Sequence, residues 1–202
     1  MAVTQTRESS SPAPRGPFTY QHLQHLRDRL DERYRCEIID GELYASLPPG
    51  LRHQWVASEL VLWLGNHVRA HKLGVMLFAP LDVIFSKVDV VVPDLLYLTN
   101  EQLAHTPDRG VEEAPTLVVE ILSPSTQRRD RTKKMTLYEE MGVPHYWLVH
   151  PTARWLEAYE RQAERFVLTA RVMGAAEFRP ALFPGLVVPL GELWLPQGSR
   201  ER

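Results

Sequence analysis

The sequence predicts a single domain that mixes helices and strands, of α/β or α+β class, around a mixed central sheet. Three segments with the helical spacing of apolar residues alternate with short apolar stretches rich in β-branched residues. The chain has 202 residues, a length that suits one domain. Hydrophobic residues make up 44% and charged residues 24%, which is the balance of an ordinary globular protein.

The two ends of the chain are expected to lie outside this domain. Residues 1–17 are rich in Ser and Pro, and residues 196–202 are similarly polar, so we predict flexible tails around a domain at 18–195. Neither a secretory signal nor a membrane span is predicted. The formal charge of −2 gives no global basic bias, and the single cysteine, Cys36, fits a cytoplasmic protein without an internal disulfide.

The first half of the domain is predicted to contain two helices and a hairpin. A helix is expected at about 20–33, and a hairpin follows at 34–46 with Asp40–Gly41 as its turn. Residues 51–73 show the longest helical pattern, which Gly74 ends. The buried stripe expected on this helix consists of Val56, Leu60, Trp63 and His67.

The second half is predicted to supply most of the sheet. The expected strands are 75–79, 81–85, 91–98, 116–122, 145–150, 154–160 and 165–171. Between the third and fourth of them, residues 99–114 are expected to form a polar loop. A third helix is predicted to begin at Ser125 or Thr126 and to run to Gly142.

Two acidic residues lie inside apolar strand patterns. Asp94 follows a proline within VVPDLLYL, and Glu120 lies within TLVVEIL. A buried carboxylate is costly unless a partner compensates its charge. If the two strands are neighbours, both carboxylates can converge on one hard cation such as Mg²⁺. The alternative is that each carboxylate is an edge residue or belongs to an ion pair in the core.

A cationic helix segment, QRRDRTKK, follows the Glu120 strand. Gln127, Asp130 and Lys134 share a helical stripe, and helical side chains lean toward the N-terminus, so Lys134 can reach back toward Glu120. A metal on carboxylates with a cation nearby suits phosphoryl chemistry. The alternative is a solvated helix face with an Asp130–Lys134 pair. That alternative is favoured for the four outer cations, Arg128, Arg129, Arg131 and Lys133.

Several motifs taken together resemble the Uma-two family of predicted restriction endonucleases, which is similar to the PD-(D/E)XK nuclease superfamily. They are YRCEIIDGELY, PDLLYL, PTLVVEILSPST and DRTKKMTLYEEMGVPHYWLVHP. The resemblance spans about residues 18–190. It implies a restriction-endonuclease-like fold, with a mixed central sheet flanked by helices.

The resemblance also implies a set of site residues. Asp94 and Glu120 would hold Mg²⁺ or Mn²⁺, and Lys134 would be the catalytic lysine. This chain departs from the superfamily pattern, because Leu122 stands where that lysine is expected. Further positions that match the family and could join the site are Glu37, Glu42 and His53, and the helical stripe adds Gln127. For His53, a hydrogen bond near the helix start is the alternative role.

The expected function is metal-dependent cleavage of phosphodiester bonds in nucleic acid, with DNA as the expected partner and a homodimer as a possible assembly. Two alternatives stay open at this point. One is a catalytically silent relative that binds nucleic acid or a protein through the same scaffold, which the displaced lysine and the acidic net charge favour. The other is a structural module in which the carboxylates are a feature of the fold.

Overall fold

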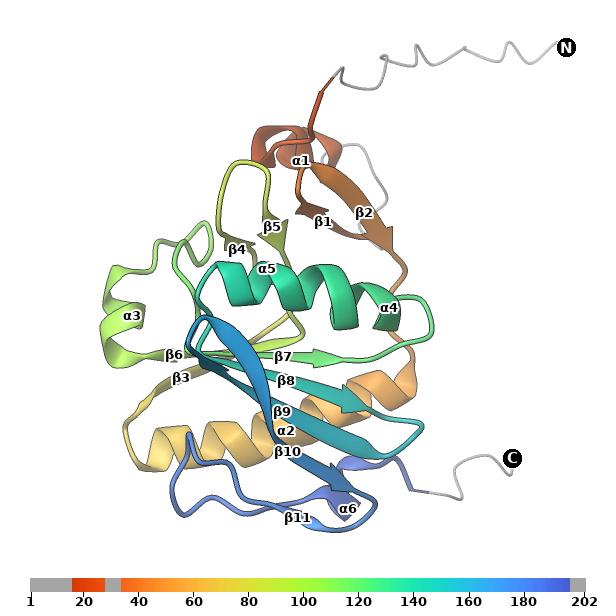
Figure 1. Ribbon diagram of the computed structural model, residues 1–202, viewed down its shortest axis with the longest axis vertical. Helices are drawn as coiled ribbons and strands as arrows, with labels where there is room; N and C mark the ends of the chain where they lie inside the picture. Colours follow the sequence, from red (N-terminus) through yellow and green to blue (C-terminus); the bar gives the residue numbers. More distant parts are fainter. Residues whose placement is uncertain (1–15, 28–33, 197–202) are drawn as a thin grey trace, which may run out of the picture.

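A six-stranded sheet forms the centre of the molecule, with helices on both faces (Figure 1). The structure is a computed structural model that describes residues 16–27 and 34–196. The strands, in spatial order, are β10 (Arg165–Met173), β9 (Trp155–Gln162), β8 (His145–His150), β7 (Leu117–Ile121), β6 (Leu95–Thr99) and β3 (Gly74–Phe78). Strands β7 and β8 are parallel, and every other neighbouring pair is antiparallel. The predicted mixed sheet flanked by helices is therefore confirmed.

The smaller elements lie around this sheet. A second sheet contains β2 (Glu42–Ser46), β1 (Arg35–Ile39), β5 (Val90–Val91) and β4 (Val83–Ile84), and a third pairs β11 (Glu177–Phe178) with β12 (Val188–Pro189). The helices are α1 (Tyr20–Arg27), α2 (Leu51–Ala70), α3 (Asn100–His105), α4 (Gln127–Arg129), α5 (Met135–Glu140) and α6 (Leu190–Leu193). A π-helical turn, η1 (Asp130–Lys134), joins α4 to α5.

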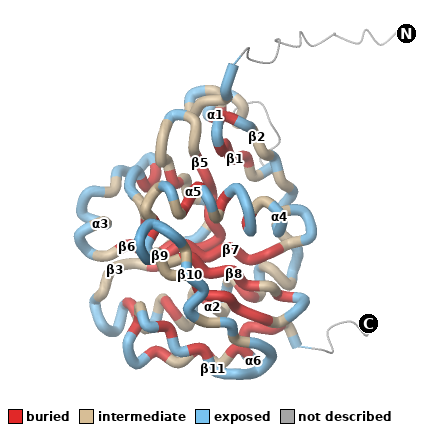
Figure 2. Tube along the Cα trace, in the orientation of Figure 1, coloured by how far each residue is buried: buried red, intermediate tan, exposed pale blue. Residues whose placement is uncertain are grey.

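Alternation along the central strands divides the core into two layers. In β6 and β7 the odd-numbered residues Leu95 and Val119 pack with α2, whereas the even-numbered residues Leu96 and Val118 pack with α5. This is the two-residue period of a strand that is covered on both faces. Figure 2 shows that the buried positions gather in the central strands, while the outer sides of the helices are exposed. Glu120 is even-numbered and therefore points toward α5.

The hairpin at the start of the domain is confirmed. Residues Asp40 and Gly41 form the turn with φ angles of 52° and 69°, the left-handed values that a two-residue turn with an Asp-Gly sequence favours. The preceding helix is described only as far as Arg27, and the remainder of the predicted 20–33 segment lies outside the described residues. The predicted tails also lie largely outside them.

The stripe predicted on α2 is partly wrong. Leu64 and Val68 are buried together with the predicted Val56 and Leu60, because the contact row continues at every fourth residue. Trp63 and His67 flank that row and are half-buried.

Gly74 was predicted to end α2, but it is the first residue of β3. A Cβ atom there would lie 2.0 Å from the carbonyl oxygen of Leu98, so glycine allows β3 to approach β6. The helix ends earlier, at Ala70.

Three more predictions on the middle of the chain need correction. The expected strand 91–98 is divided into β5 and β6, because Pro93 interrupts the ladder. The expected loop 99–114 contains α3, which a reciprocal capping box between Thr99 and Gln102 begins. The expected helix after Glu120 is interrupted by η1.

In the described part of the chain, no helix combines the length and the hydropathy of a membrane span.

Candidate functional site

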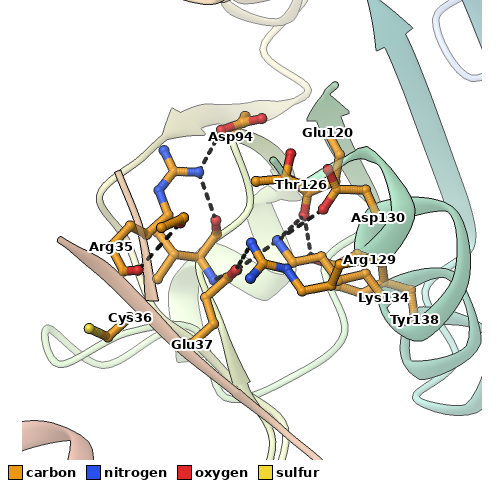
Figure 3. A network of polar contacts seen from close by, with 12 residues as sticks. Arg35, Cys36, Glu37, Asp94, Glu120, Thr126, Arg129, Asp130, Lys134 and Tyr138 are labelled. Atoms are coloured by element: carbon orange, nitrogen blue, oxygen red, sulfur yellow. Dashed lines mark hydrogen bonds and ion pairs between the residues drawn. The ribbon is translucent and has the colours of Figure 1, made fainter. Parts of the chain in front are cut away.

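Asp94 and Glu120 lie opposite each other on neighbouring strands. The register pairs Leu95 with Val119, so the next step along the antiparallel pair brings Asp94 beside Glu120. The backbone N–H of Ile121 donates to Oδ2 of Asp94 over 2.8 Å. The neighbouring strands on which the sequence prediction depended are therefore present, and both carboxylates belong to one polar network (Figure 3).

Asp94 is anchored from three directions. Nη1 of Arg35, from β1, lies 2.6 Å from Oδ1, and Nε2 of His53, from the first turn of α2, lies 3.0 Å from Oδ2. The third contact is the N–H of Ile121. Burial by itself would raise the pKa of Asp94, but the hydrogen bonds and charges of His53 and Arg35 outweigh it and hold the pKa below its usual range. Asp94 is therefore a fixed carboxylate at neutral pH.

Lys134 reaches Glu120, as the sequence predicted. Its Nζ atom lies 2.8 Å from Oε1 of Glu120, 2.6 Å from Oε1 of Glu37 and 3.9 Å from Oδ1 of Asp130. The side chain is buried, with an exposed fraction of 2%. Burial would lower the pKa of this ammonium, but the three surrounding carboxylates outweigh it, so the pKa lies above its usual value. Lys134 therefore keeps its positive charge.

Compared with Asp94 and Asp130, Glu120 has the surroundings that are least favourable to the ionised carboxylate. The Tyr138 hydroxyl donates to Oε1 over 2.8 Å, so this oxygen is shared by a phenol and the Lys134 ammonium. Burial raises the pKa of Glu120 to about 8; Lys134 opposes this rise, and the other buried carboxylates add to it. Asp130 behaves similarly, because burial raises its pKa to about 6 against the opposing charge of Lys134.

Glu37 links the small sheet to the helix. Its Oε1 accepts from the backbone N–H of Val92 over 2.9 Å, in addition to its contact with Lys134. Nη2 of Arg129 lies 3.0 Å from Oε2, an ion pair that lacks hydrogen-bond geometry. Glu37 is completely buried. Charged side chains therefore contact one another here from three segments that are distant in sequence: β1, β7 and the α4–α5 helix.

The π turn explains how two cations from one helix reach the same carboxylate. A π turn contains one more residue between hydrogen-bonded partners than an α turn, and such turns are frequent at functional sites. Arg129 and Lys134, five positions apart, both point toward Glu37. The α-helical stripe that predicted Gln127 beside Lys134 is wrong here, because η1 changes the rotational phase of the helix; Gln127 is exposed.

Two predicted positions have different outcomes. Glu42 lies outside the network, because its exposed carboxylate pairs instead with Lys133 and with the Tyr44 hydroxyl. His53 contacts Asp94 directly, so it does more than cap α2.

The sequence reasoning missed several members of the network. Arg129 was assigned to the solvated face, but its side chain is largely buried. Arg35 was not considered, although residues two apart in a strand share a face, so Arg35 could have been placed beside Glu37. Tyr138 lies within the quoted motif DRTKKMTLYEEMGVPHYWLVHP, but no local pattern indicated its contact with Glu120.

The donor atoms of the network fit a magnesium or manganese ion held by two carboxylates and water. A carboxylate has about four acceptor positions. No described side chain hydrogen-bonds Oε2 of Glu120, and Oδ1 of Asp94 has one close partner. Among residues 16–27 and 34–196, no three His, Cys, Asp or Glu side chains form a metal-binding group, so an all-protein cage does not fit. Mg²⁺ commonly uses one or two carboxylates and retains water.

Comparisons with known proteins show the fold and the family of this chain. A structural search found the "Crystal structure of a putative nuclease belonging to DUF820 from Anabaena variabilis". That structure matches with a TM-score of 0.71 and 20% sequence identity, covering 88% of this chain and 98% of the other, and it shows a shared fold. No curated protein matches the sequence. A family model with the description "Putative restriction endonuclease" matches residues 19–191, so this chain belongs to the Uma2 family.

Proposed function

We propose that this protein is a metal-dependent endonuclease that hydrolyses phosphodiester bonds in nucleic acid, with DNA as its substrate. The observation that carries the proposal is the contact between Lys134 and Glu120, directly beside Asp94. Two carboxylates and a lysine from separate segments are the groups that phosphodiester hydrolysis requires: ligands for a cation and a donor for the developing charge. The family and the structural neighbour support the same class of activity.

In this proposal Asp94 and Glu120 hold one Mg²⁺ or Mn²⁺ ion. When bound, the ion supplies positive charge to the phosphate and acidifies its water ligands. Arg35 and His53 keep Asp94 in a single orientation by binding both of its oxygens. Tyr138 and Lys134 orient Glu120 through Oε1 and leave Oε2 for the ion.

Lys134 has a second role in the proposal. Its ammonium makes contacts with three carboxylates and carries three donors, so its charge is fixed in position before substrate arrives. Donation to a phosphate oxygen stabilises the charge that develops as water adds to phosphorus and one P–O ester bond breaks. The reaction leaves a phosphate monoester and a free hydroxyl group.

The test is cleavage of supercoiled plasmid in Mg²⁺, Mn²⁺, Ca²⁺ or chelator. We expect wild type to cut with Mg²⁺ or Mn²⁺ and Glu120→Gln to be inactive. Glu42→Gln is the matched control, because this carboxylate also lies within a family motif but is outside the network. Equal activity of the two variants would overturn the assignment of the site. The homodimer remains a prediction: paired sites linearise the plasmid in one encounter, whereas single sites nick it.

A second candidate is a nuclease-fold protein that binds nucleic acid without cutting it. One observation favours it: cationic side chains already neutralise the buried carboxylates, with Arg35 on Asp94 and Lys134 on Glu120. Each of these two carboxylates therefore has a cation beside it without a metal. Salt-dependent retention of DNA, with no cleavage under any of the divalent ions, would support this candidate over the first.

A further inference from the structure

A groove runs along α2 on the side of β3. One hollow of about 370 Å³ begins at the Asp94 end of the network, where His53 lines it. A second hollow of about 430 Å³ continues toward Lys72 at the other end of the helix. Both are lined by Val61 and Leu62, so the two hollows lie next to each other along α2, and together they are called the α2–β3 groove. Figure 1 shows α2 extending beneath the central sheet from the end near α4 to the end near β3.

The middle of the α2–β3 groove is apolar and exposed. Phe78, the last residue of β3, is 60% exposed, and Leu62 is 54% exposed. The register pairs Phe78 with Leu95, which places this aromatic ring one residue away from Asp94 on the neighbouring strand. Phe78 stacks on no other aromatic ring among the described residues. A flat apolar surface therefore lies open beside the candidate catalytic carboxylates.

The far end of the α2–β3 groove is positively charged, whereas the Asp94 end carries both signs of charge. Arg35 and His53 line the Asp94 end together with the Asp94 carboxylate that they contact. Arg69 and Lys72 line the other end, and neither pairs with an acidic side chain in the described part of the chain. Arg69 follows His53 by sixteen residues on α2, which corresponds to about 24 Å at 1.5 Å per residue. The spacing is long enough for several nucleotides.

We propose that the α2–β3 groove binds an unpaired DNA strand that leads to the cleavage site. This inference rests on the proposed function and adds the form of the substrate. A base stacks on Phe78, the phosphate beside it faces Arg35, and phosphates farther along the strand meet Arg69 and Lys72. The base must be unpaired, because the π face of a stacked base pair is not available to a side chain.

The chemistry of the α2–β3 groove favours a nucleic acid strand over a protein segment. Proteins that bind single strands combine a positive groove along the backbone with aromatic side chains on which bases stack. A hollow of about 370 Å³ lies in the range of small-molecule sites and can hold one base with its sugar. An amphipathic protein helix needs an apolar path along its whole length, whereas the apolar part of this groove ends at cationic residues.

The test measures anisotropy of a labelled oligonucleotide in Ca²⁺, as the single strand, as the duplex and as RNA of the same sequence. We expect the DNA strand to bind more tightly than the duplex or the RNA. Phe78→Ala should weaken binding of the strand roughly 5- to 150-fold, the range for loss of one stacked base. Leu103→Ala is the control, because Leu103 is exposed on α3 and lines neither hollow. Melting curves check that both variants fold.

A second measurement examines the stacking and the charges separately. A 2-aminopurine base in the strand should lose fluorescence on binding to wild type and keep it with Phe78→Leu. The double substitution of Arg69 and Lys72 to alanine should reduce the salt slope by about 0.7 for each lost phosphate contact. Lys87→Ala, on the loop between β4 and β5, is the charge control and should leave the slope unchanged.

The outcomes separate this inference from the proposed function. Metal-dependent cleavage with equal strand binding by Phe78→Ala and Leu103→Ala would overturn the strand in the α2–β3 groove and leave the nuclease proposal intact. Strand binding that depends on Phe78, with no cleavage under any metal, would overturn the nuclease proposal and leave the strand in the α2–β3 groove intact. Tighter binding of duplex or RNA overturns the inference. So does self-association that Phe78→Ala abolishes in the absence of strand binding, since a second copy would then be the occupant.

Discussion

Two adjacent lysines meet very different surroundings. Lys134 is buried among Glu37, Glu120 and Asp130, whereas Lys133 lies at the surface against Glu42 and the ring of Tyr44. Both lysines have close carboxylate partners, and both have a pKa raised by them. Contact distance therefore does not distinguish the two sites.

The difference lies in what each lysine leaves behind when it is removed. Around Lys133, water can solvate every charge that loses its partner, so the ion pair adds little to stability. Around Lys134, the three carboxylates are buried, with exposed fractions of 2% or less, and an unpaired buried charge is costly. Each charge in the buried network therefore depends on its partners for compensation. Each charge in the surface cluster can be compensated by water instead. Four predictions test this contrast.

The largest effect is expected from Lys134→Ala. Removing one partner from a buried ion cluster typically costs about 3–5 kcal/mol, so the free energy of unfolding should fall by that amount. Cleavage measured on the folded fraction should fall about a hundredfold or more, with little change in DNA affinity. Urea unfolding and plasmid cleavage are the measurements. Wild-type stability would mean that Lys134 is not essential to the neutralisation of the network.

The two candidate metal ligands should differ from each other when no metal is present. Asp94→Asn removes the anion that Arg35 and His53 face, which should cost about 1.5–3 kcal/mol. Glu120→Gln removes a carboxylate that burial disfavours, so stability should be kept or should rise slightly. Both variants should lose Mg²⁺ and Mn²⁺ binding. Thermal melting and titration calorimetry decide the matter, and unchanged metal affinity in both variants would contradict the metal site.

The pH dependence of the metal-free protein should show the same contrast. The pKa of Glu120 in the folded protein is about 8, above its value in the unfolded chain. Between about pH 5 and pH 8 the folded state therefore binds more protons than the unfolded state. Stability should therefore fall over that window, and Glu120→Gln should flatten the fall. The depressed pKa of Asp94 acts only at lower pH, where its contribution is lost as pH falls. Metal binding at pH 7 should release protons, detectable as a dependence of the calorimetric heat on the buffer.

The smallest effect is expected at the surface cluster. Lys133→Ala and Glu42→Gln should each leave the unfolding midpoint within experimental scatter, because both side chains are solvated. A double-mutant cycle between them should give a coupling near zero, and a cycle between Lys134 and Glu120 should give a large one. If Lys133→Ala removes cleavage as Lys134→Ala does, the two lysines are not functionally distinct. A weaker salt dependence of DNA binding is the one change expected for Lys133→Ala.

The fold and the centre of the site could be predicted from the sequence, because both depend on the local pattern of apolar and charged residues. Apolar strands with Asp94 and Glu120 inside them predicted a sheet with two acids, and the lean of helical side chains predicted the reach of Lys134. The partners of these residues had no such signal. Whether Arg129 is buried depends on the rotational phase of a helix that η1 alters. The contact of His53 with Asp94 depends on how α2 docks beside β6, which no local pattern specifies.

The capping box of α3 is a different kind of omission. Thr99 and Gln102 have the spacing that begins a helix, so this helix could have been predicted from residues already in view. The polar residues around this pair favoured the prediction of a loop at 99–114 over the prediction of a helix.

The π turn at Asp130–Lys134 has one more consequence, which concerns changes in chain length. A turn with one additional residue can lose that residue and become ordinary α-helix while both of its ends stay where they are. Deleting Thr132, whose side chain bonds only to the carbonyl of Arg128, would therefore leave α4 and α5 on their present packing surfaces. After this deletion Arg129 and Lys134 would be four positions apart in an α-helix, a spacing that keeps both side chains on the face that meets Glu37. At this position the fold and the charge network can therefore both tolerate the loss of one residue.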